Sequence, residues 1–143
     1  MNMKNTKLQE QIVELRILLQ SVCDGFDTQQ LNKKSTLTMR TKVLYVIHKY
    51  PSCPPSVLIS SLGIAKSNLA LLCKSLCDDG VIEATKGDGD QRNVYYTITP
   101  KGERELYEFY ASMANDVKLT SREQVSMEKK FDDIIAFFNK KYK

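Results

Sequence analysis

The chain has 143 residues, 42% of them hydrophobic and 27% charged, with a formal net charge of +4. This is the composition of a globular protein and excludes a wholly disordered chain, and no apolar run approaches the roughly 18 residues of a membrane-spanning helix. Charged and amide side chains are frequent in residues 1–11, where a secretory signal needs an apolar segment, so we expect a cytoplasmic protein without a membrane partner.

The first predicted element is an amphipathic helix near the N-terminus. Its apolar residues recur at steps of four and three, the spacing of one helix face: Leu8, Ile12, Leu15, Leu19 and Val22. We expect Gly25 to end this helix. A stripe this regular at a chain end favours a partner helix, and packing onto its own domain is the alternative.

Three further helices follow, separated by turn-forming residues. Thr38 is placed to cap a helix that Pro51 stops. Pro55 suits the first turn of a short helix that ends at Gly63, and the next helix follows at once and closes at Gly80. Two helices joined by a tight glycine-containing turn are the signature of a helix-turn-helix.

After this point the hydrophobic period becomes that of a strand. Residues 81–86 and 94–98 are predicted to pair as a hairpin around a turn at 87–90. Pro100 then opens a fifth helix, and Thr120 with Glu123 has the form of a capping box at the start of a last one. That last helix has heptad-like apolar residues: Met127, Phe131, Ile134, Phe138 and Tyr142.

This order of elements, and several of its residues, resemble the MarR (multiple antibiotic resistance regulator) family. The likeness is best over residues 37–102. Residues 58–64 look like that family's third helix and turn, and Leu76, Gly80 and Val81 occupy positions that the family fills similarly. Its wing signature is similar to two segments of this chain: Asp90-Gln91-Arg92 and Thr97-Ile98-Thr99-Pro100-Lys101-Gly102.

The resemblance implies a mainly α fold with a small β-hairpin, a winged helix-turn-helix flanked by dimerisation helices. We expect residues 1–35 to form the N-terminal dimerisation helix and connection, 36–100 the DNA-binding domain, and 101–143 the C-terminal dimerisation helices. The implied function is a homodimeric transcriptional regulator, usually a repressor, on a pseudo-palindromic operator in double-stranded DNA. A small-molecule effector, or an oxidant, is the implied signal for release.

The outward face of the fourth helix carries the candidate DNA contacts: Lys66, Ser67, Asn68, Ala70, Leu71, Lys74 and Ser75. Lysines neutralise phosphates, and an asparagine such as Asn68 pairs with adenine. The family often has Thr and Arg where this chain has Ala70 and Leu71, which leaves fewer hydrogen bonds to bases. A winged-helix protein-interaction module that does not read DNA is therefore the alternative function. An ordinary solvated helix face is the alternative explanation of these residues, and the preceding turn and the following wing count against it.

The predicted wing adds three candidates. Arg92 near the hairpin tip is suited to a narrow minor groove, Asp90 can orient it, and Lys86 across the turn can contact a phosphate. The alternative for the Asp90–Arg92 pair is a surface ion pair of little energetic value.

Aromatic residues are the candidates for an effector pocket between the dimerisation helices and the winged helix: Phe26, Tyr45, His48, Tyr107 and Tyr110. Ordinary core packing is the alternative explanation for all of them.

The cysteines and the absence of catalytic motifs limit which redox, metal or enzymatic activities the sequence supports. Cys23, Cys53, Cys73 and Cys77 form no Cys-x-x-Cys pair, and reduced thiols are the default in the cytoplasm. Cys73 lies on the apolar stripe of its helix, so we expect it in the core, with a cysteine-based redox-sensing regulator as a further alternative. The sequence has no phosphate-binding loop, nucleophile elbow or metal-ligand cluster, so we expect no enzyme, cofactor or metal.

Overall fold

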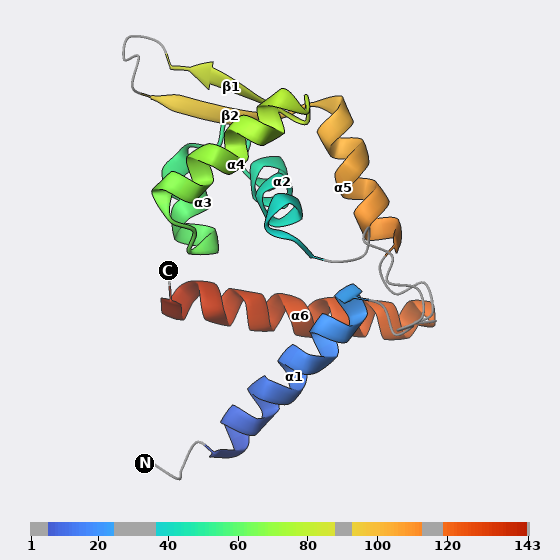
Figure 1. Cartoon of the computed structure of the whole chain (residues 1–143). Helices are drawn as coiled ribbons and strands as arrows, with labels where there is room; N and C mark the ends of the chain where they lie inside the picture. The colour runs from blue at the N-terminus through green and yellow to red at the C-terminus, as the bar shows by residue number, and fades with distance from the viewer. Residues whose placement is uncertain (1–5, 25–36, 88–92, 113–118, 143) are drawn as a thin grey trace.

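A computed structural model describes residues 6–24, 37–87, 93–112 and 119–142 (Figure 1). The elements in chain order are α1 (Thr6–Asp24), α2 (Met39–Lys49), α3 (Pro55–Leu62), α4 (Lys66–Asp78), β1 (Ile82–Lys86), β2 (Val94–Ile98), α5 (Pro100–Ser112) and α6 (Ser121–Tyr142). The expected fold class, mainly helical with one small hairpin, is confirmed.

The turn residues act as the sequence predicts. The Thr38 hydroxyl accepts a hydrogen bond from the backbone N–H of Thr41 at 3.3 Å and so caps α2. Pro55 occupies the first turn of α3, and Gly63 ends that helix with a left-handed φ of 64°. The chain bends by 116° between α3 and α4, which is within the range of a helix-turn-helix.

A single apolar core holds the winged helix together, with α2 between α3, α4, α5 and the hairpin (Figure 1). Its members are almost completely removed from solvent, and their burial is the main stabilising term: Val43, Leu44, Val46, Ile47, Leu58, Leu69, Cys73, Leu76, Val81, Ile82 and Leu106, with Cys53. Cys73 therefore lies in the core, as its place on the apolar stripe predicted.

The wing is a two-stranded antiparallel ribbon in which Ile82 pairs with Ile98. The middle of β2 is also joined to the link between α2 and α3. The Cys53 N–H donates to the Tyr96 carbonyl at 2.9 Å, and the Tyr96 N–H donates to the Cys53 carbonyl at 2.8 Å. This bridge fixes the position of the wing relative to the domain. Because it involves one residue on each side, it leaves no repeating pattern by which the sequence could have predicted it.

The turn after α4 is joined to the start of α5. The Thr99 hydroxyl donates to the Gly80 carbonyl at 2.6 Å and accepts from the Gly102 N–H at 3.1 Å. A Cβ at Gly102 would collide with the Val81 carbonyl oxygen, so this close approach requires glycine.

α1 and α6 form a second layer, in which α1 crosses α6 beneath the winged helix (Figure 1). The capping box predicted for α6 is present: the Glu123 N–H donates to the Thr120 hydroxyl at 3.2 Å, and the Glu123 carboxylate accepts from Thr120. Gly25, the predicted end of α1, lies outside the described residues. Within the described part of the chain, no single helix is long and apolar enough to cross a membrane.

Candidate nucleic-acid interface

The geometry of α4 separates its packing residues from its candidate contacts. Leu69, Cys73 and Leu76 turn one side of the helix into the core. The sequence-predicted contacts are all exposed: Lys66, Ser67, Asn68, Ala70, Leu71, Lys74 and Ser75. The packing of the winged helix therefore leaves this face of α4 open to a partner.

The electrostatics of α4 differ between its two ends. Lys66 begins the helix, no acidic residue lies in the first turn, and Ala65 at the N-cap has no side-chain acceptor for the first amides. Free amides and the helix dipole make such an end favourable for an anion such as phosphate. Asp78 and Asp79 lie at the other end, so the N-terminal end of α4 is more favourable for an anion than its C-terminal end.

Basic side chains of α2 and α5 pair with the acidic C-terminal end of α4. Arg40 at the start of α2 donates to both carboxylate oxygens of Glu105 on α5 at 2.9 Å, and it also pairs with Asp79. The hydrogen bond with Glu105 is the main cause that raises the pKa of Arg40, against the opposing effect of partial burial. The Lys101 ammonium donates to the Asp79 carbonyl at 2.8 Å. Sequence reasoning missed this cluster because its partners are far apart in the chain.

The described part of the wing contains one of the three predicted contacts. Lys86 is exposed at the end of β1, where it pairs across the ribbon with Val94. Asp90 and Arg92 lie outside the described residues, so their roles stay predictions.

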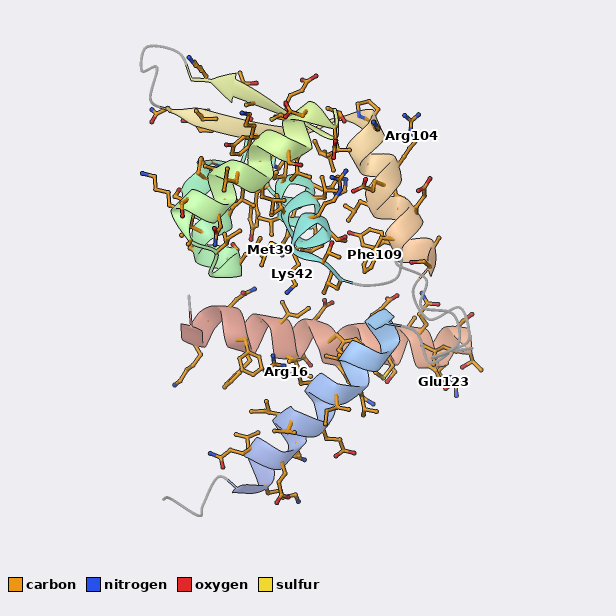
Figure 2. The ribbon with its side chains drawn as sticks, viewed as in Figure 1. Arg16, Met39, Lys42, Arg104, Phe109 and Glu123 are labelled. Carbon is orange, nitrogen blue, oxygen red and sulfur yellow. The ribbon has the colours of Figure 1, made fainter. Side chains whose placement is uncertain are left out.

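A cavity of about 370 Å³ lies between α2, α3 and α5. Tyr45 and Tyr110, two of the candidates for an effector pocket, line it. The lining residues that sequence reasoning missed include Lys42 and Lys49. Steps of three and four place them with Tyr45 on one face of α2, and this spacing was visible in the sequence. Figure 2 places Lys42 on the side of α2 toward α6.

The other effector candidates lie elsewhere. His48 and Tyr107 contact each other edge to face with ring centres 5.8 Å apart, and the Tyr107 hydroxyl is 3.5 Å from His48 Nε2. Neither lines the cavity between α2, α3 and α5. Phe26 lies outside the described residues.

The described thiols are poor candidates for reactive groups. Cys53 and Cys73 are buried and Cys77 is partly buried, and burial raises the pKa of all three, that of Cys73 to about 11. The thiolate, the reactive form, is therefore scarce at neutral pH. Among the described residues, no group of histidine, cysteine and carboxylate side chains is arranged to hold a metal ion. The side chain of Cys23 is outside the described part.

Two curated relatives match part of this chain. The HTH-type transcriptional regulator PetP of Rhodobacter capsulatus is 36% identical over 70 residues, 47% of this chain and 42% of PetP. The uncharacterized HTH-type transcriptional regulator YvnA of Bacillus subtilis is 30% identical over 112 residues, 76% of this chain and 69% of YvnA. The chain belongs to the HTH-type transcriptional regulators. No family model matches it, and it spans less than half the length of PetP.

Solved structures of MarR-type proteins have the same fold as this regulator. A putative MarR-like transcription regulator from Bacillus cereus has a TM-score of 0.62 at 22% identity, covering 99% of this chain and 100% of its own. A mutant MarR of Escherichia coli, complexed with operator DNA, has a TM-score of 0.59 at 18% identity, with coverages of 94% and 99%. FabT of Streptococcus pneumoniae, also in complex with DNA, has a TM-score of 0.56 at 19% identity, with coverages of 95% and 95%.

Proposed function

We propose that this regulator binds double-stranded DNA as a homodimer, with α4 in the major groove and the wing beside it. The observation that carries the proposal is the open face of α4, where Lys66, Ser67, Asn68 and Lys74 are exposed while the opposite side is fixed in the core. The DNA complexes of MarR and FabT, proteins of the same fold, support it. A recognition helix of this kind contacts base edges with its N-terminal residues.

Exposed apolar side chains on α1 and α6 support assembly into a dimer. Leu8 and Ile12 of α1, with Ile134 and Phe138 of α6, border a cavity of about 430 Å³ between the two helices, and all four remain exposed in the single chain. A group of exposed apolar side chains on neighbouring helices is typical of a surface that a protein partner covers. We propose that the segments 1–35 and 101–143 provide the interface, and that a second copy covers it. The two copies of α4 would then meet the half-sites of a pseudo-palindromic operator.

We propose a repressor that a small molecule releases from its operator. The cavity between α2, α3 and α5 supports the release step, because its lining combines Tyr45, Tyr50 and Tyr110 with Lys42 and Lys49. Convergent aromatic and polar groups in a concave site are typical of ligand pockets. A ligand there would move α5 relative to α2 and so change the spacing of the two recognition helices.

Salt-dependent binding of random duplex DNA tests the central proposal. Each lysine that neutralises a phosphate adds about 0.9 to the slope of log affinity against log salt. We expect the K66A/K74A double variant to bind more weakly with a slope lower by about 3.6, because the proposed dimer loses four phosphate-neutralising lysines. Lys129→Ala, which replaces an exposed lysine on α6, should leave the slope unchanged. DNA binding without a salt dependence, or none at all, would favour the protein-interaction module instead.

A further inference from the structure

Leu71 is the outermost apolar side chain of α4. It is 70% exposed, whereas Leu69 and Leu76 on the same helix are 2% and 0% exposed. At about 100° per residue, Leu71 lies about 200° around the helix from Leu69, directly away from the core. Packing within the domain therefore does not explain this leucine.

The neighbours of Leu71 place it at the centre of the candidate DNA-binding face. Residues three and four positions apart are neighbours on a helix, so Ser67 and Asn68 precede it by one turn and Lys74 and Ser75 follow by one turn. All four are polar and exposed. When α4 enters a major groove, the groups on both sides of Leu71 reach hydrogen-bonding or charged partners, and Leu71 itself faces the floor of the groove.

We propose that Leu71 reads the C5-methyl group of a pyrimidine in each half-site. The edges of the four bases present hydrogen-bond donors and acceptors in the major groove, and the thymine methyl is the apolar group among them. A leucine side chain cannot pair with a donor or acceptor, and its burial against one would leave that polar group desolvated. The inference rests on the proposed DNA-binding function and assigns what the centre of its interface recognises.

A methyl group at C5 occurs in two sources, thymine and 5-methylcytosine, which present it at the same place in the groove. Removing one buried methyl group from such a contact should weaken binding about fourfold, which corresponds to about 0.8 kcal/mol. In a two-fold complex the loss of both methyl groups should approach about 15-fold, because well-separated base contacts add.

The experiment uses the full chain and duplexes selected by it from a random-sequence library. Each thymine of the selected site is replaced in turn by deoxyuridine, which removes the methyl group and keeps the hydrogen-bonding pattern. We expect one position in each half-site at which the replacement costs about fourfold at constant salt. At that position cytosine and 5-methylcytosine are then compared, and we expect 5-methylcytosine to bind about fourfold more tightly.

Leu71→Ala assigns the effect to this side chain. We expect the variant to bind thymine and deoxyuridine duplexes equally, with unchanged thermal unfolding because Leu71 is exposed. Lys74→Ala is the matched control on the same face, and it should weaken both duplexes equally and keep the fourfold ratio.

Three results would overturn the inference. Equal affinity of the unmutated protein for all deoxyuridine duplexes would exclude methyl readout while DNA binding stands. A thymine preference that persists in Leu71→Ala would assign it to DNA shape. Failure to enrich any duplex from the library, together with no salt-dependent binding, would overturn the proposed function itself.

Discussion

Arg40 and Glu105 form a two-pronged ion pair that joins α2 to α5. Nε and Nη2 of Arg40 each donate to one carboxylate oxygen of Glu105 at 2.9 Å, a geometry that matches the planar guanidinium to the carboxylate. The third nitrogen, Nη1, pairs with Asp79 at the end of α4. One side chain thus connects α2, the end of α4 and α5.

Arg40→Ala should lower the free energy of unfolding by about 1 kcal/mol. Exposed ion pairs usually contribute about 1 kcal/mol or less, and the bidentate geometry places this one toward the upper part of that range. Chemical denaturation at low and high salt provides the measurement, and the difference from the parent should shrink at high salt. Arg104→Ala, on the exposed side of the same α5 (Figure 2), is the control and should change stability little.

Gly102→Ala should destabilise the fold more than Gly63→Ala. The Cβ of an alanine at position 63 would have no atom within 4 Å, so the only penalty is the left-handed backbone conformation. That conformation should lower the free energy of unfolding by about 1–2 kcal/mol. Alanine at Gly102 has to displace the Val81 carbonyl and the Ile98 side chain, and overpacking of this kind costs about 1–3 kcal/mol or more. Thermal unfolding of the two variants compares them, and an equal or smaller loss for Gly102→Ala would contradict the close approach of α5 to Val81.

Stability should fall as the pH rises from 9 to 11. Burial raises the pKa of Cys73 from 9.0 to about 11 and that of Tyr96 from 10.0 to about 12. Above pH 9 the unfolded chain therefore loses protons that the folded chain retains, and unfolding becomes easier. The stabilisation from Cys73 is fully present below pH 9 and is lost by about pH 11.

The midpoint of thermal unfolding, measured from pH 7 to pH 11, checks this dependence. Tyr96→Phe should reduce the fall above pH 10, because the variant no longer has the phenol that ionises in the unfolded chain. A midpoint that stays constant to pH 11 would show that these groups titrate alike in both states.

Mild peroxide should leave DNA affinity nearly unchanged. The raised pKa values of Cys53, Cys73 and Cys77 keep these thiols protonated at neutral pH, and protonated thiols react slowly with oxidants. Titration of DNA before and after peroxide is the measurement. An affinity loss that dithiol reverses, and that Cys23→Ser or Cys77→Ser abolishes, would instead favour the redox-sensing alternative.

Local signals in the sequence predicted the helices and the hairpin, but the sequence did not predict contacts between residues far apart in the chain. Thr38, Pro55, Gly63 and the Thr120 capping box act within one helical turn, so their residue types are sufficient to place the helix ends. The bridge between Cys53 and Tyr96 and the Arg40 cluster join residues brought together by folding alone. Pairing of this kind follows from tertiary packing and produces no period along the chain.

In the candidate site, too, the features that depend on local sequence were predictable and those that depend on tertiary packing were not. The exposure of Lys66, Leu71 and Lys74 followed from the helical period once Leu69 and Cys73 were assigned to the core. Of the aromatic candidates, Tyr45 and Tyr110 line one cavity, while His48 and Tyr107 contact each other outside it. Which aromatic residues converge depends on the angle between α2 and α5, and neither helix sequence contains that angle.

Leu15→Asp should prevent dimerisation or unfold the protein. Leu15 is half-buried in the single chain and lines the cavity between α1 and α6 with Phe137 and Phe138, so a carboxylate there would be desolvated in the proposed interface without a partner. Arg16→Asp introduces the same aspartate at the next position of α1, which is exposed, and this variant should stay dimeric. Sedimentation equilibrium with circular dichroism separates the two effects, because a folded monomer keeps its helical signal and an unfolded chain does not. A stable, folded monomer of the unmutated chain would refute the dimer, and the apolar residues of α1 and α6 would then need another partner.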